Sequence, residues 1–159
     1  MQAEPHLLKH LIRWVTWGGV MRALGIDLGA RRVGLAISDA TGTLARPLTT
    51  LKVNGPDLVD LVAREIDRLA AEDDGLSVIV VGLPARLDGT ASDETARASA
   101  FIEALGRRTV IPIVGEDERL TSHEAEARLA IRERDWRKRK LKLDAAAAAV
   151  FLQDFLDRR

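Results

Sequence analysis

Residues 24–39 read LGIDLGARRVGLAISD, two apolar runs joined by a short polar turn. Runs of this length, separated by a few turn residues, are typical of a β-hairpin. We therefore expect a hairpin with Ala30, Arg31 and Arg32 at or near its turn. One acid, Asp27, lies inside the first apolar run. A carboxylate in a buried strand is costly unless it is paired, hydrogen-bonded or bound to a metal, so Asp27 is the first candidate functional residue.

The composition is that of one folded domain. Hydrophobic residues make up 47% of the 159 residues, which is enough for a substantial core and excludes a disordered chain. The absence of cysteine excludes disulfides and thiolate metal sites and favours a reducing, cytoplasmic compartment. The 24 basic residues are balanced by 24 acidic ones, which argues against a uniformly basic nucleic-acid binder. No apolar run is long enough to span a bilayer, so no membrane partner is expected.

Residues 1–20 stand apart from the rest of the chain. Apolar residues recur there at helical spacing between charged ones, which fits a membrane-surface helix, a signal peptide or an accessory extension. No small-residue cleavage pattern is clear, and Met21 directly precedes the first strand. We favour the accessory extension, with residues 21–159 as a single domain.

The segments after the hairpin alternate between strands and helices. Arg46-Pro47 suggests that the third strand lies at a sheet edge, because proline cannot donate to a neighbouring strand. The expected elements are a strand at 43–51, a helix at 58–69, a buried strand at 77–81, a helix at 92–105 capped by Ser92 or Asp93, a strand at 110–114, and helices at 121–131 and 144–157. This order predicts an α/β domain with a mixed sheet, strand order 3-2-1-4-5 and strand 2 antiparallel.

Three acids are expected to meet at one end of this sheet. Asp27 lies in the central strand, Glu118 just past the last strand, and Asp144 at the start of the last helix. The ends of strands 1, 4 and 5 are close in the order 3-2-1-4-5, so the three carboxylates could converge. Oxygen ligands of this kind suit Mg²⁺ or Mn²⁺. One or two such ions can activate water against a phosphodiester.

Each acid also has a purely structural interpretation. Asp144 could be the N-cap of the last helix. Glu118 could belong to a solvated acidic loop, Glu116-Asp117-Glu118. Asp27 could be a buried acid paired with Arg32. The metal-site interpretation therefore depends on the three acids together.

The stretch from Met21 to Leu156 also resembles the YqgF family, described as Holliday junction resolvases and pre-16S rRNA nucleases with an RNase H-like fold. The matching motifs are Gly25-Ile26-Asp27-Leu28-Gly29, Arg46-Pro47-Leu48, Val81-Gly82-Leu83-Pro84, Asp88-Gly89-Thr90, Asp117-Glu118-Arg119-Leu120-Thr121 and Lys142-Leu143-Asp144. The resemblance implies an RNase H-like nuclease domain whose catalytic, metal-binding acids are Asp27, Glu118 and Asp144. It also implies that the residues near the substrate phosphates include Arg31, Arg119, Lys140 and Lys142.

A basic segment directly precedes Asp144. Residues 128–142 hold eight lysines and arginines against two acids. Such a cluster beside a catalytic acid can bind a phosphate backbone, although many charge runs are simply solvated surfaces. The candidate nucleic-acid-binding residues are Arg31, Arg32, Arg119, Arg137, Lys138, Lys140 and Lys142.

These features predict a metal-dependent endonuclease for structured nucleic acid. The favoured substrate is the 5′ end of pre-16S rRNA in ribosome biogenesis, and the alternative is a branched DNA, the Holliday junction. Junction resolution needs two active sites and hence a homodimer, whereas RNA trimming does not require one, so a monomer or a homodimer is expected. A non-catalytic RNase H-like binding module is a further alternative. An actin-like ATPase is disfavoured, because the chain is too short for two lobes.

Overall fold

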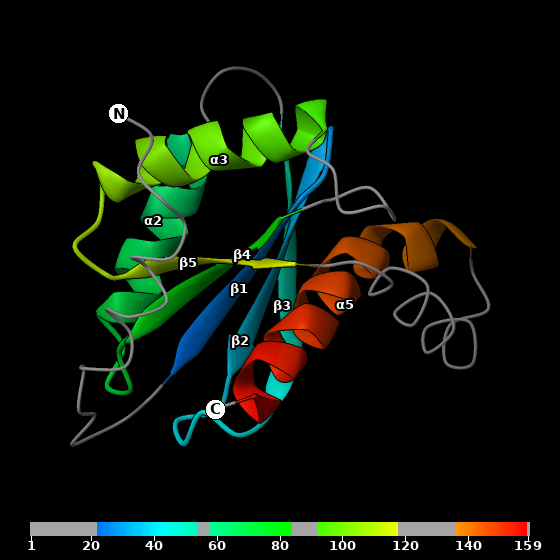
Figure 1. Cartoon of the computed structure of the whole chain (residues 1–159). Coiled ribbons are helices and arrows are strands. Elements are labelled where there is room, and N and C mark those ends of the chain that lie inside the picture. Colours follow the sequence, from blue (N-terminus) through cyan, green and yellow to red (C-terminus); the bar gives the residue numbers. More distant parts are fainter. Residues whose placement is uncertain (1–21, 54–57, 84–91, 118–135, 159) are drawn as a thin grey trace.

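The fold is known from a computed structural model, which describes residues 22–53, 58–83, 92–117 and 136–158, with the backbone alone for 117 and 136–142. In these ranges the chain forms a five-stranded sheet with helices on both faces (Figure 1). The strands are β1 (Ala23–Leu28), β2 (Arg32–Ser38), β3 (Ala45–Lys52), β4 (Val78–Leu83) and β5 (Ile113–Asp117). The helices are α2 (Leu58–Ala70), α3 (Asp93–Gly106) and α5 (Trp136–Asp157).

The sheet has the predicted topology. Its strand order is β3-β2-β1-β4-β5. β1, β2 and β3 pair antiparallel, and β4 and β5 add in parallel on the other side of β1. The hairpin of residues 24–39 is thus confirmed, and β3 is an edge strand that contains Pro47. Asp27 consequently lies in the central strand.

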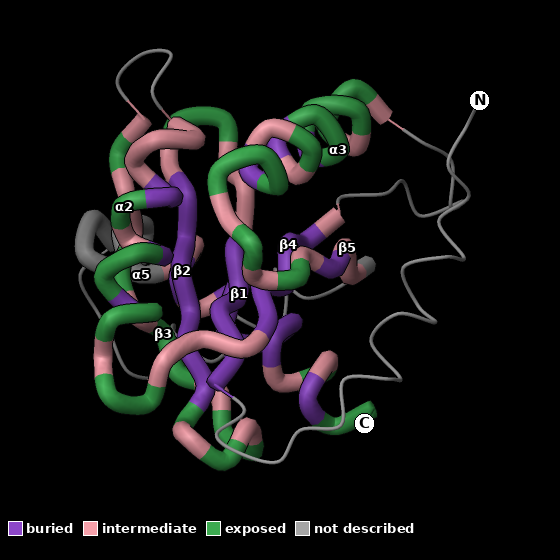
Figure 2. The backbone as a smooth tube through the Cα atoms, turned by 90° about the vertical axis from the view of Figure 1, so that its left-hand side faces the viewer, coloured by how far each residue is buried: buried purple, intermediate pink, exposed green. Residues whose placement is uncertain are grey.

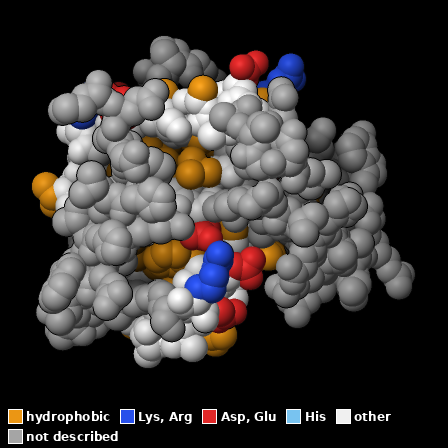
Figure 3. All heavy atoms as spheres, in the orientation of Figure 1, with side chains coloured by type: hydrophobic (Ala, Val, Ile, Leu, Met, Phe, Trp, Pro, Cys, Tyr) orange, Lys and Arg blue, Asp and Glu red, His pale blue; other side chains and the backbone are white. Residues whose placement is uncertain are grey.

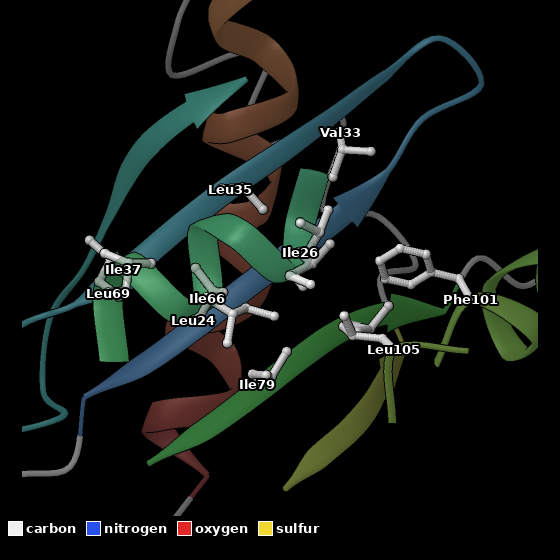
Figure 4. Close-up of a cluster of buried hydrophobic side chains, with 13 residues drawn as sticks. Leu24, Ile26, Val33, Leu35, Ile37, Ile66, Leu69, Ile79, Phe101 and Leu105 are labelled. Carbon is white, nitrogen blue, oxygen red and sulfur yellow. The ribbon is translucent and has the colours of Figure 1, made fainter. Parts of the chain in front are cut away.

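Side chains of alternate strand residues pack into two separate cores, one on each face of the sheet. One face of the sheet packs on α2 and α3, with Leu24 and Ile26 of β1 among its buried side chains (Figure 4). The other face packs on α5, where Ala23 of β1 lies with Phe151 and Leu152. Figure 2 shows that the buried backbone follows the central strands. This alternation determines toward which face of the sheet each side chain of β1 points.

Small residues let α5 approach the sheet closely. A Cβ atom added to Gly25 would lie 3.0 Å from the Cβ of Leu152, and one added to Gly34 would lie 2.0 Å from the carbonyl oxygen of Asp144. Asp144 and Leu152 are eight positions apart, so they share one stripe of the helix. The two glycines therefore set the height of α5 above β1 and β2.

Two predicted boundaries are wrong. The fifth strand runs from Ile113 to Asp117 instead of 110–114, and Val110 is fully exposed. The last helix begins at Trp136 instead of Asp144, so part of the basic segment is helical. Asp144 lies inside α5, and its interpretation as a helix N-cap is therefore wrong. The helix expected at 121–131 and residues 1–20 lie outside the described residues.

Among the helices that the structure describes, none combines the length and apolar character needed to cross a membrane.

Candidate active site

Asp27 lies where β1 leaves the core. The four residues before it are buried, whereas Asp27 and Leu28 are half-buried. Asp27 stands directly opposite Gly34 of β2, and opposed residues of an antiparallel pair point to the same face. Gly34 faces α5, as its contact with the Asp144 backbone shows. The Asp27 carboxylate is therefore directed to the α5 face of the sheet.

Asp144 of α5 lies on this same face of the sheet, close to Asp27 in β1. Its backbone lies against Gly34, the residue opposite Asp27. Its side chain accepts a hydrogen bond from Arg32, whose Nε lies 2.9 Å from Oδ2. The two side chains are 27% and 21% exposed, so the ion pair is largely shielded from solvent. The structure thus gathers Asp27 and Asp144 on one face at one level of the sheet.

A cavity of about 240 Å³ opens beside this pair of acids. Its lining consists of Gly29, Ala30, Arg31, Arg32 and Asp144. Its lining residues include one acid and two arginines, and this volume admits a phosphate group. An arginine guanidinium pairs with phosphate through two parallel hydrogen bonds. The cavity is therefore suited to an anionic substrate held next to an acid.

The turn between β1 and β2 forms one wall of the cavity. The amide of Gly29 donates to the carbonyl of Arg32 over 2.8 Å. A Cβ atom at Gly29 would lie 2.5 Å from that same carbonyl oxygen, so the turn requires glycine at this position. The amide of Val53 donates to the carbonyl of Arg31 over 3.0 Å. These bonds hold the two arginines on a well-defined backbone.

Arg97 of α3 also contacts this turn, and sequence analysis did not identify it. Its Nη2 donates to the carbonyl of Gly29. α3 itself is held by a capping box between Ser92 and Thr95 and by the buried side chains of Phe101 and Leu105. Nothing in the local sequence distinguishes Arg97 from any other exposed arginine of an amphipathic helix.

Two of the acidic residues that were expected to follow the last strand belong to that strand. Glu116 and Asp117 belong to β5, where they pair with Gly82 and Leu83 of β4. The Glu116 side chain is 15% exposed, and its carboxylate forms an ion pair with Arg158 near the end of α5. Figure 3 shows acidic and basic side chains mixed over this part of α5. Glu116 and Asp117 thus belong to a strand, whereas Glu118, the subject of the solvated-loop interpretation, lies outside the described residues.

The structure places some of the predicted site residues and leaves the others undescribed. Asp27 and Asp144 come together, and Arg31 and Arg32 line the cavity beside them. Arg32 is paired with Asp144, and the pairing of Asp27 with Arg32 that the sequence suggested stays an interpretation. The remaining candidates lie outside the described side chains: Glu118, Arg119, Arg137, Lys138, Lys140 and Lys142. Within the described residues no three His, Cys, Asp or Glu side chains form a metal-binding group, so the triad with Glu118 stays a prediction.

The chain is similar to known proteins in both sequence and fold. A family model described as Holliday junction resolvase, RuvX, matches residues 21–158. The chain belongs to the RuvX family. This is the YqgF family under another name, so the resemblance is confirmed. One RuvX relative, from Anaeromyxobacter dehalogenans, is 42% identical over 140 residues and covers 87% of this chain and 98% of its own length. Another, from Bacillus cereus, is 37% identical over 145 residues, with 87% and 100% covered. Both are named "Putative pre-16S rRNA nuclease".

Solved structures confirm the RNase H-like fold of this RuvX family member. The resolvase of Fowlpox virus, in complex with Holliday junction DNA, superimposes with a TM-score of 0.54 at 14% identity, over 87% of this chain and 98% of that one. RuvC of T. thermophilus, in complex with a Holliday junction substrate, gives a TM-score of 0.51 at 17% identity, over 87% and 95%. At these identities the likeness establishes the fold alone.

Proposed function

We propose that this protein is a divalent-metal-dependent nuclease that cleaves phosphodiester bonds in structured nucleic acid, with the precursor of 16S rRNA as its substrate. The observation that carries the proposal is the meeting of Asp27 and Asp144 across Gly34, beside a cavity lined by Arg31 and Arg32. The names of the curated relatives support the choice of substrate. A cytoplasmic location follows from a role in ribosome biogenesis.

The donor set at the site fits Mg²⁺ or Mn²⁺. Asp27 and Asp144 offer carboxylate oxygens, and no thiolate exists in the chain. Hard divalent cations prefer such oxygen ligands. We propose that these two acids hold one or two ions together with Glu118, which directly follows the last residue of β5. A bound ion of this kind supplies a Lewis acid that polarises the phosphodiester and activates water.

The arginines supply the other half of the proposed chemistry. Arg31 is exposed and Arg32 is half-buried, and both line the cavity. Their guanidinium groups would bind the phosphates that flank the cleaved bond and would balance the charge that develops on it. Arg137, Lys138, Lys140 and Lys142 lie in the first turns of α5, the helix that also carries Asp144. We propose that they extend the phosphate-binding surface along the nucleic acid, together with Arg119.

A second candidate function is the resolution of Holliday junctions. The description of the family model favours it, because the model that matches residues 21–158 is that of a Holliday junction resolvase. Resolution requires two cuts, one on each of two strands, and therefore two copies of this site in one complex. A homodimer in solution would be expected for this function and not for RNA trimming.

The test is cleavage of matched substrates. Pre-16S rRNA fragments, duplex DNA and four-way DNA junctions are incubated with the protein and either Mg²⁺ or Mn²⁺. We expect cleavage of the RNA, and we expect Asp27→Asn to abolish it while nucleic-acid binding persists. Asp154→Asn is the matched control, because Asp154 is an exposed acid of α5. Metal-independent binding without cleavage of any substrate would instead indicate a non-catalytic RNase H-like module.

A further inference from the structure

A chain of contacts links α3 to Asp144 through the β1–β2 turn. Arg97 of α3 donates to the carbonyl of Gly29. The amide of Gly29 donates to the carbonyl of Arg32 over 2.8 Å, and Nε of Arg32 donates to Oδ2 of Asp144 over 2.9 Å. The contacts run from one face of the sheet to the other, because α3 and α5 pack on opposite faces (Figure 1).

Each end of this chain of contacts is fixed in the core. On the α3 side, Ala98 directly follows Arg97 and is buried, and so is Phe101 one turn further along the helix. On the α5 side, the backbone of Asp144 rests on Gly34. The turn between them is a short protrusion past the last buried residues of β1, since Gly29 is half-buried and Ala30 and Arg31 are exposed. The turn therefore needs lateral support if Arg32 is to stay aligned with Asp144.

We propose that Arg97 is a positioning residue of the nuclease site: it holds the β1–β2 turn so that Arg32 aligns the Asp144 carboxylate. This inference rests on the proposed nuclease function, which it deepens. Arg97 acts through the Gly29 carbonyl and does not itself bind the substrate. Side chains that orient the groups of a reactive site typically change rate more than affinity, because a shift of about 1 Å in a reacting group can cost on the order of a hundredfold.

The first experiment compares Arg97→Gln with wild type in steady-state cleavage. We expect kcat to fall by about tenfold to a hundredfold, with KM for the nucleic acid and the salt dependence of binding unchanged. Arg97→Lys should recover part of kcat, because an ammonium can donate to the same carbonyl. Arg107→Gln is the matched control: Arg107 is an exposed arginine that caps the far end of α3 and pairs with Glu103.

Two outcomes of this comparison would overturn the inference. One is an Arg97→Gln enzyme with wild-type kcat. The other is weaker nucleic-acid binding with a salt slope reduced by about one, which is the signature of a lost phosphate contact.

A second readout does not depend on catalysis. Amide exchange measured by NMR at Gly29 and Val53 reports the opening of the turn, because the two amides donate to the carbonyls of Arg32 and Arg31. We expect faster exchange in Arg97→Gln and wild-type exchange in Arg107→Gln. Unchanged exchange at both amides in Arg97→Gln would overturn the inference. Faster exchange in a protein whose wild type cleaves nothing would support the contact chain and overturn the nuclease function instead.

Discussion

Arg32 in β2 and Asp144 in α5 are 112 positions apart in the sequence and form an ion pair, with Nε of the arginine 2.9 Å from Oδ2 of the acid. The pair lies at the cavity wall, and Gly34 lies beneath it. One carboxylate oxygen of Asp144 is thus fixed by the arginine. Hydrogen-bond partners of this kind hold a carboxylate in the orientation that metal binding needs. They therefore matter nearly as much to a site as the ligands themselves.

Arg32→Gln should destabilise the protein by about 1–2 kcal/mol, because it leaves a half-buried carboxylate without its charged donor. Urea denaturation at neutral pH measures this difference. Arg107→Gln is the control, since its ion pair with Glu103 is 70% and 72% exposed and should contribute much less. A double-mutant cycle with Asp144→Asn isolates the pair. A coupling energy near zero would contradict the structural importance of this contact.

Gly34→Ala should be among the most damaging small substitutions in the chain. Its Cβ would lie 2.0 Å from the carbonyl oxygen of Asp144 and 2.6 Å from the amide nitrogen of Ala145, and backbone atoms cannot move aside cheaply. We expect a loss of about 2–3 kcal/mol from such overpacking, with cleavage reduced further because α5 moves away from Asp27. Thermal unfolding and cleavage of the same preparation test both effects.

Gly106→Ala provides the matched control for this substitution. A Cβ atom there meets nothing within 4 Å, and Gly106 ends α3. The same chemical change should therefore be neutral or stabilise the protein by about 0.5 kcal/mol. Equal effects of the two substitutions would show that the approach of α5 to Gly34 does not constrain the site.

The strand order and the place of Asp27 could be predicted because they depend on local signals. A hairpin, two crossovers through helices and an edge proline define the order 3-2-1-4-5 almost completely. The start of α5 could not be predicted in this way. Its first turns consist largely of lysine and arginine, which read as a charged linker although both residues are good helix formers.

The register of β5 and the contacts at the site depend on tertiary structure. Gly115, Glu116 and Asp117 have weak strand preferences, yet pairing with β4 draws them into the sheet. The ion pair of Arg32 with Asp144 exists only because α5 docks on Gly34. Arg97 has no signal of its own in the sequence, because its role depends on where α3 lies relative to the turn.

Stability should fall in acid partly through Glu72. The hydrogen bond from Arg22 to its carboxylate, and next the charge of Arg22 and the pair with Arg68, hold the pKa of Glu72 below its ordinary value of 4.5. A carboxyl group whose folded pKa is lowered stabilises the fold above its unfolded pKa, and this contribution is lost as pH falls through the folded pKa. Glu72→Gln should therefore be less stable than wild type near neutral pH and equally stable in strong acid.

Chemical denaturation of both proteins across this pH range tests the prediction. The difference in midpoint should shrink as the pH drops below about 4.5. A difference that stays constant down to strong acid would mean that Glu72 stabilises the protein by packing and not by its charge.

Asp144→Asn should weaken metal binding, because a neutral amide oxygen replaces a charged ligand of the proposed ion. We expect the Kd for Mn²⁺, measured by calorimetry without nucleic acid, to rise by about tenfold or more. Asp154→Asn, in the same helix but exposed, should bind Mn²⁺ as the wild type does. Because Asp144 is also the partner of Arg32, Arg32→Gln is measured alongside to separate loss of the ligand from loss of its orientation. An unchanged Kd in Asp144→Asn would remove Asp144 from the metal site and leave it as a structural partner of Arg32 alone.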